Sequence, residues 1–434
     1  MRRVGYIAVA ILVLATVAVQ AQQQPLVIHE WGTFTALQDE TGNAIGHINT
    51  DDEPLPGFVH DLTDADLAIT DRAVANLRDL RFNKGLPHPA MPSVTMRLET
   101  PVVYFYPPRG ASLPTTLDLE VSFRGGWLSQ FYPDAEVEAP GLHDGVLDRN
   151  TIGWLRWRQL QVGTQGRLPE TSEKVWLAPR AVRAASVTTA AGESERYLFY
   201  RGVGHLEAPL RIVRDEQADR LDVYPQIAAE LSSRATLAVP GLWLVEVRPD
   251  GRCAFRTHAP VTLGAGSEQP IASLPAALNE WEFSEGCLGG LRRSMHEELV
   301  AAGLFDDEAA AMLNTWEVSY FRSPGMRLFF LVPRAWTDHY LPLTVSVPAE
   351  MVRVMVGRIE LVTPHQRTLI QHITEQPIPT EPSEGTMPVA YRDLGRFREA
   401  LLLAELSERP TDTLRAFISL HGADRSVVPP GTAP

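Results

Sequence analysis

The sequence predicts an α+β protein with a β-rich, antiparallel, sandwich-like N-terminal part and a mixed, helix-rich C-terminal part. From residue 26 to about residue 260, short runs of β-branched and aromatic residues are separated by Gly and Pro clusters. After about residue 275, signals for helix starts and stops become frequent. Short strands without a helix between them favour antiparallel pairing over a parallel βαβ sheet.

The strand-rich part is predicted from runs that begin near Leu26, Thr100 and Arg196, and from two clearer patterns. In residues 117–123, Leu, Val and Phe alternate with Asp, Glu and Ser, which indicates a strand with one buried and one wet face. The apolar residues 242–247 and 253–255 flank Asp-Gly, which predicts a hairpin.

Helices are predicted mainly in the second part. One is expected at residues 63–85 within the strand-rich part. A helix at 292–303 ends at a glycine, and another begins at Asp306 with acidic residues in its first turn. Residues 348–362 favour a helix, although their alternating valines also fit a strand. Residues 363–375 begin with a capping box and form the next predicted helix.

The first 21 residues have the pattern of a cleavable signal peptide. Arg2 and Arg3 precede an uncharged apolar run that ends near Val19, with small residues up to Ala21. The run has about 16 residues, fewer than the ~20 that a membrane-spanning helix needs. We therefore expect a periplasmic or secreted protein with no transmembrane span after cleavage. The alternative is a retained N-terminal anchor helix.

Composition shifts divide the chain into six expected segments. The last strongly apolar helix pattern lies at 398–408, and prolines gather just before it. The segments are the signal peptide 1–21, a β-rich domain 22–270, a mixed α/β region 271–375, a proline-rich linker or strap 376–389, C-terminal helices 390–423 and a disordered tail 424–434.

The charge balance excludes some partners. The chain has 39 Lys and Arg against 53 Asp and Glu, a formal net charge of −14, and its basic residues are scattered. Binding to nucleic acid requires a basic patch, so we expect no nucleic-acid partner. The same acidity argues against docking on anionic lipid.

The two cysteines, Cys253 and Cys287, both lie in the part expected to be exported. An even pair in an oxidising compartment predicts one disulfide. Two separate buried thiols are the alternative. A metal site built on these cysteines is not indicated, because no histidine stands at ligand spacing from either.

The segment His-Glu-Trp-Gly-Thr-Phe at 29–34 holds the densest set of functional residue types. His29 can serve as a base or metal ligand, and Glu30 as a base, nucleophile or ligand. In a strand without a bulge these neighbours face opposite ways, so they cannot chelate one ion together, although each can join a site completed by other segments. The alternative is structural: Trp31 and Phe34 are core residues, and Glu30 meets an arginine across the sheet.

A second group of candidates lies in the acidic segment 47–71. Its carboxylates offer oxygen ligands for a divalent cation, but their spacing does not match an EF-hand loop. The cofactor is therefore unknown, and a divalent metal is a hypothesis without a recognised motif. The candidate metal ligands are His29, His47, Asp51, Asp52 and His60.

Glu99 precedes a wholly apolar strand and, with Glu30, is our candidate for a catalytic carboxylate pair. The alternative for Glu99 is an ion pair with Arg97 or with a more distant arginine. Trp154 and Trp157 are the best local candidates for stacking on a sugar ring, although core packing is the commoner role of tryptophan.

The chain resembles a group of uncharacterised exported bacterial proteins that carry an HEWGTF motif just after the signal peptide. This resemblance implies export and a shared fold. It implies no activity, cofactor or catalytic residue. The similar segments are 29–35 (HEWGTFT), 99–106 (ETPVVYFY), 200–204 (YRGVG) and 356–364 (VGRIELVTP).

Two functions fit these observations. The first is a binding or structural component of the cell envelope that recognises a ligand or an envelope protein, which fits the absence of the common catalytic motifs from the sequence. The second is an extracytoplasmic hydrolase that uses the carboxylate pair or a His/carboxylate metal site. The hydrolase requires Glu30, Glu99 and a histidine to line one cleft. The sequence does not determine whether the protein is an enzyme, and it does not determine the oligomeric state.

Overall fold

The computed structural model describes residues 25–49, 55–62, 86, 91–232, 237–264, 269–317, 320–377 and 388–421. The predicted signal peptide at 1–21, the candidates Asp51 and Asp52, the predicted helix at 63–85 and the tail at 424–434 lie outside these residues.

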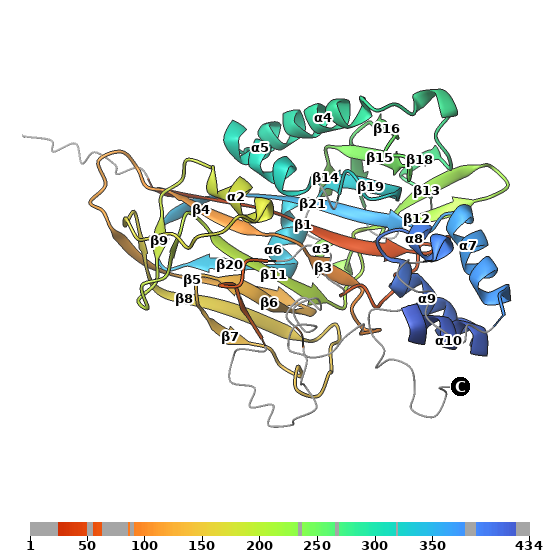
Figure 1. The fold of residues 1–434 in the computed structure, drawn as a ribbon. Coiled ribbons are helices and arrows are strands. Elements are labelled where there is room, and N and C mark those ends of the chain that lie inside the picture. The colour runs from red at the N-terminus through yellow and green to blue at the C-terminus, as the bar shows by residue number, and fades with distance from the viewer. Residues whose placement is uncertain are drawn as a thin grey trace, which may run out of the picture.

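One large mixed sheet dominates the molecule (Figure 1). Five further strands pair at its sides, and two small antiparallel sheets accompany it. In spatial order the sheet runs β10 (Ser194–Glu195), β9 (Val187–Thr188), β8 (Ile152–Val162), β6 (Gly126–Tyr132), β11 (Leu198–Gly204), β3 (Met96–Leu98), β1 (Leu26–Gln38), β21 (Ala349–Leu361), β19 (Gly325–Leu331), β15 (Leu242–Val247) and β16 (Cys253–His258). The side strands are β2 (His60–Asp61), β4 (Val102–Tyr106), β5 (Thr115–Arg124), β7 (Glu136–Glu138) and β20 (Leu343–Val345), and the small sheets are β12 (Leu210–Asp215), β13 (Arg220–Pro225) and β18 (Ala272–Pro275), and β14 (Leu237–Val239) with β17 (Val261–Leu263).

The centre of the sheet pairs the first described strand with a strand from the C-terminal part of the chain. Strands β1 and β21 pair in parallel along their whole length, from Leu26 opposite Ala349 to Gln38 opposite Leu361. The helix favoured for 348–362 is therefore wrong, and the alternative interpretation, a strand, is correct. Most of β21 is buried, and a strand covered on both faces loses the clear alternation that separates strand from helix in sequence.

Each face of β1 packs against a different apolar cluster. Ile28 and Phe34 belong to the cluster that includes the buried side of β5 and the small sheets. Trp31 points to the other face, where its cluster includes buried residues of helices α4 (Cys287–Ala301) and α5 (Asp306–Thr315). Alternation along a strand thus sets which side chains of the HEWGTF segment meet which core.

The longer helices lie outside the large sheet. Figure 1 shows α4 and α5 together on one side of it, and α7, α8, α9 and α10 gathered at one end. Among the described residues no helix is both long and apolar enough to cross a membrane. The helices are α2 (Lys174–Arg180), α3 (Ala229–Ser232), η1 (Glu280–Glu282), α4 (Cys287–Ala301), α5 (Asp306–Thr315), α6 (Arg334–Tyr340), α7 (Pro364–Glu375), α8 (Val389–Asp393), α9 (Arg398–Glu408) and α10 (Asp412–His421).

The predicted fold class, α+β and rich in β-structure, is confirmed. Strand β5 shows the expected alternation of buried and more accessible residues. The hairpin of β15 and β16 forms around Gly251, whose positive φ of 85° suits glycine. The predicted capping box of α7 is present, with Thr363 Oγ1 accepting from the backbone N–H of Gln366.

Candidate functional site

Glu30 is buried in an ion pair across the centre of the sheet. It stands opposite Arg353 in the pairing of β1 with β21, and Arg353 Nε donates to Glu30 Oε2 at 2.5 Å. The Tyr200 hydroxyl donates to Glu30 Oε1 at 2.5 Å. Burial raises the pKa of Tyr200, and the nearby Glu30 carboxylate raises it further. The structural alternative for Glu30, an arginine across the sheet, is what the structure shows.

Glu99 is paired in the same way with a different arginine. Arg97 Nε donates to Glu99 Oε1 at 2.6 Å, and Arg396 Nη2 lies 3.5 Å from the same oxygen. This pair lies against the face of β1 that carries Thr35, because Thr35 stands opposite Arg97 in the strand pairing. Glu30 faces the other way along β1. The sheet therefore separates the two carboxylates, which argues against their acting as a catalytic pair.

His29 forms a buried pair that the sequence did not suggest. Its Nδ1 lies 2.7 Å from Oε2 of Glu308, in the first turn of α5, and the Glu308 side chain has no exposed surface. The Tyr106 hydroxyl donates to Glu308 Oε1 at 2.7 Å. Burial raises the pKa of Tyr106, and the negative charge of Glu308 adds to this effect. Phe305 covers the imidazole at a ring distance of 4.5 Å.

Among the described residues, the predicted ligands His47 and His60 do not join His29 in a group that could hold a metal ion. His60 Nε2 lies 3.0 Å from both carboxylate oxygens of Glu193, and its ring stacks on Tyr132. His47 occupies a left-handed turn with φ 62°. Within the residues that the structure describes, no group of three or more His, Cys, Asp or Glu is placed to hold a metal ion. The contribution expected from Asp51 and Asp52 remains a prediction.

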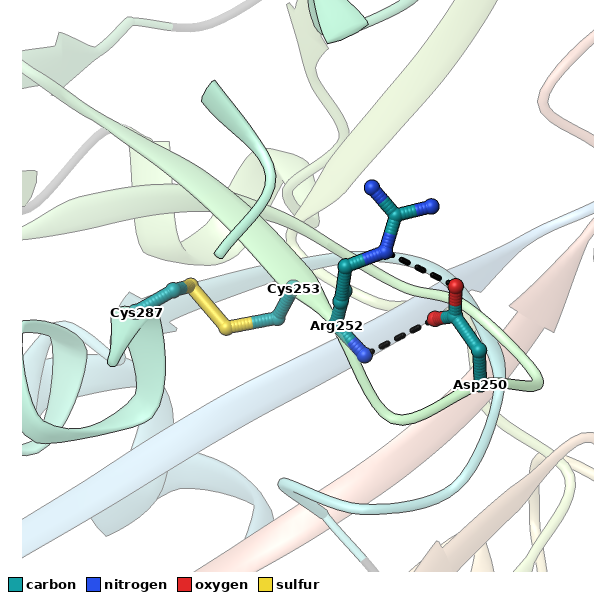
Figure 2. The surroundings of a disulfide bond; sticks show 4 residues. All are labelled: Asp250, Arg252, Cys253 and Cys287. Atoms are coloured by element: carbon teal, nitrogen blue, oxygen red, sulfur yellow. Dashed lines mark hydrogen bonds and ion pairs between the residues drawn. A yellow bond between two sulfur atoms is a disulfide. The ribbon is translucent and has the colours of Figure 1, made fainter. Parts of the chain in front are cut away.

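The predicted disulfide between Cys253 and Cys287 is confirmed, with the Cα atoms 5.6 Å apart. Figure 2 shows it joining the start of β16 to the first turn of α4. In the adjoining turn, the Asp250 carboxylate accepts from the backbone N–H of Arg252 at 2.9 Å and from its Nε at 2.8 Å. The backbone of Cys253 also exchanges two hydrogen bonds with Ser284. The segment before α4 is therefore fastened to β16.

That fastened segment carries an exposed tryptophan. Seven of the nine tryptophans in the chain are almost completely buried, whereas Trp281 in η1 is 81% exposed. Trp157, a candidate for sugar stacking, is a core residue. The guanidinium of Arg156 lies over Trp154, with its Cζ 4.9 Å from the centre of the Trp154 ring. Trp281 is therefore the tryptophan best placed to contact another molecule.

Both neighbours of Trp281 are held by arginines of the β15–β16 hairpin. Arg256 donates to Glu282 through Nε at 2.7 Å and through Nη2 at 2.8 Å. Arg248 contacts Glu280 at 2.8 and 2.7 Å. Two-point contacts of this kind fix geometry as well as charge. We name Trp281, with Glu280, Glu282 and their arginine partners Arg248, Arg252 and Arg256, the Trp281 platform.

The sequence offered only a weak signal for the platform. The pattern Glu-Trp-Glu at 280–282 puts acidic residues on both sides of a tryptophan. This pattern does not distinguish an exposed tryptophan from a partly buried one. Arginines of the β15–β16 hairpin hold both glutamates, while Trp281 between them is exposed. Those contacts span 26 to 32 residues of sequence and depend on the hairpin and on the disulfide.

Comparisons with known proteins do not assign the chain to a family. No protein-family model and no curated protein matches the chain. Among solved structures, the Fcho1 Mu homology domain of Danio Rerio with bound Eps15 peptide is similar to 79% of this chain and 96% of that chain. The sequence identity is 8% and the TM-score is 0.27. A TM-score this low carries no argument about fold or function.

Proposed function

We propose that this protein is an exported binding component of the cell envelope and that it recognises its ligand through the Trp281 platform. The observation that carries the proposal is the 81% exposure of Trp281 on a segment fixed by ion pairs and a disulfide. Tryptophan and arginine are the residues that most often dominate binding energy at interfaces. The export itself rests on the signal-peptide pattern of residues 1–21.

The rigidity of the platform supports a binding role. A side chain that is mobile before binding loses conformational entropy in the complex, and this loss weakens affinity. Here the residues on both sides of Trp281 are held by two-point contacts, so the backbone that carries the indole ring is fixed before binding. Binding then has to order the Trp281 side chain alone, and the entropy cost of ordering the surrounding segment is avoided.

The experiment is co-sedimentation of the purified mature protein with envelope fractions of its own cell. Trp281→Ala is expected to weaken binding about 30-fold, since truncation of a central tryptophan costs about 2 kcal/mol or more. The matched control is Leu113→Ala, which removes an exposed apolar side chain elsewhere, one with 52% exposure. Equal sedimentation of the two variants and the parent protein would refute the proposal.

A second candidate function, hydrolysis of an extracytoplasmic polymer without the Glu30 and Glu99 pair, is favoured by one observation. A buried carboxylate that fixes an imidazole through Nδ1, as Glu308 does for His29, is the arrangement that orients general bases and metal-bound histidines. The test is release of soluble fragments from envelope polymer by the parent protein and by His29→Gln. Release that His29→Gln abolishes at unchanged melting temperature supports this candidate, and no release by the parent protein rejects it.

A further inference from the structure

We infer that the ligand of the Trp281 platform is an uncharged glycan of the cell envelope. This inference rests on the proposed function and adds the chemical class of the ligand. It follows from the charge balance of the platform and from its supply of hydrogen-bonding groups. It also follows from the lack of a second strongly exposed large hydrophobic side chain in the described parts of residues 248–287.

Together with Asp250, which forms an ion pair with Arg252, the Trp281 platform is locally neutral within an acidic protein. Three arginines stand against Asp250, Glu280 and Glu282, whereas the whole chain has a formal net charge of −14. Arg252 contacts both Asp250 at 2.8 Å and Glu280 at 3.2 Å. Because each charge already has a partner of opposite sign, a charged ligand gains little attraction unless it breaks a pair. An uncharged ligand faces no such cost.

The same ion pairs leave polar atoms for a polyhydroxyl ligand. A paired carboxylate keeps lone pairs that accept hydrogen bonds, and a guanidinium group has five N–H donors. The side chains of Arg252, Arg256 and Glu280 are 38%, 39% and 69% exposed, so polar atoms of the platform reach solvent. Sugar hydroxyl groups both donate and accept, and the C–H face of a pyranose ring is apolar and matches the flat indole face.

A protein partner fits this surface less well. A stable protein interface covers about 800 Å² on each partner, and its centre is usually apolar. In the described parts of residues 248–287, Trp281 is the one large hydrophobic residue that is strongly exposed. Phe283, two residues away, is buried. The guanidinium of Arg248 lies over it, with its Cζ 3.6 Å from the centre of the Phe283 ring. A single aromatic ring among hydrogen-bonding groups suits one or two sugar units better than a protein surface.

The test treats envelope fractions before co-sedimentation, because the individual glycan is not identified. One sample is digested with a broad protease, a second is extracted with organic solvent to remove lipid, and a third is oxidised with periodate, which cleaves the vicinal diols of sugars. Sedimentation of the parent protein is expected to survive protease and solvent and to fall about tenfold after periodate. It is also expected to change less than twofold between about 0.05 and 0.5 M salt, because an uncharged ligand is insensitive to screening.

The variants separate this inference from the proposed function. If Trp281→Ala loses sedimentation but protease or solvent abolishes binding of the parent protein, the binding function stands and the glycan is wrong. A steep fall of binding with salt would likewise replace the uncharged ligand with a charged one. If Trp281→Ala sediments like the parent protein, both proposals fail. Trp281→Phe keeps an aromatic face and is expected to retain at least a third of the parent's affinity, which separates stacking from loss of fold.

Discussion

The buried pair of Glu30 and Arg353 allows a quantitative test of the structural role assigned to the HEWGTF segment. The two side chains are 1% and 2% exposed and lie opposite each other on β1 and β21. Replacement of Arg353 by Met leaves the Glu30 carboxylate in the core without its cation. Breaking a buried ion pair in this way costs about 3–5 kcal/mol, so Arg353→Met is expected to lower the free energy of unfolding by that amount.

The companion variant removes the whole polar group. Glu30→Leu, Arg353→Met and Tyr200→Phe together replace the carboxylate, its cation and the hydroxyl donor by apolar side chains. Arg353 Nη2 is buried and has no hydrogen-bond partner in the described part of the chain, so part of the native pairing is incomplete. We therefore expect the triple variant to lie within about 1–2 kcal/mol of the parent protein, because no charge is left unpaired.

Urea unfolding followed by circular dichroism measures both effects. The matched control is Arg158→Met, which breaks an ion pair with Glu136 of similar length, 2.7 Å, in which both side chains are about half exposed. Surface pairs contribute little, so the urea midpoint of this control should stay close to that of the parent protein. The reasoning is refuted if Arg353→Met is as stable as the control, or if the triple variant is less stable than Arg353→Met.

Three further predictions concern the disulfide, a helix cap and the response to acid. Replacing both cysteines by alanine removes a link across 34 residues and is expected to cost about 3–4 kcal/mol in urea unfolding; an unchanged midpoint would contradict this. Thr363→Ala removes the cap of α7 and should cost about 1 kcal/mol, whereas Thr363→Ser should restore most of it. Hydrogen bonds from Arg256 lower the pKa of Glu282 to about 2, so the stabilisation from this pair is complete above its ordinary pKa near 4.5 and is lost as the pH falls through about 2. The emission of Trp281, measured as the difference between the parent protein and Trp281→Phe, should therefore stay constant down to about pH 4, and a change between pH 7 and 5 would show that the pair does not hold the platform.

Local sequence patterns predicted much of the secondary structure. The alternation in β5, the Asp-Gly hairpin and the capping box of α7 each depend on residues close together in the chain, and all three are present. Strand β21 was harder because it is central and mostly buried, which makes a strand resemble a helix in composition. The parallel pairing of β1 with β21 joins residues 323 apart, and no local pattern specifies it.

The candidate site was less predictable because its contacts also join residues that are far apart in the chain. The sequence identified His29 and Glu30 as residue types that can act in catalysis or metal binding. Their partners Glu308 and Arg353 lie 279 and 323 residues away. Pairing Glu30 with an arginine across the sheet was one of two open interpretations, and only the register of the strands decides between them. The neighbours of Trp281 are likewise held by arginines of a separate hairpin, and residue type alone does not separate this exposed tryptophan from the seven buried ones.

The most direct test of the account is co-sedimentation of the mature protein and its Trp281→Ala variant with envelope fractions, at matched melting temperatures. The binding proposal predicts that the parent protein sediments and that the variant loses about 30-fold in affinity while Leu113→Ala binds normally. Sedimentation of Trp281→Ala equal to that of the parent protein would contradict the central role of the Trp281 platform.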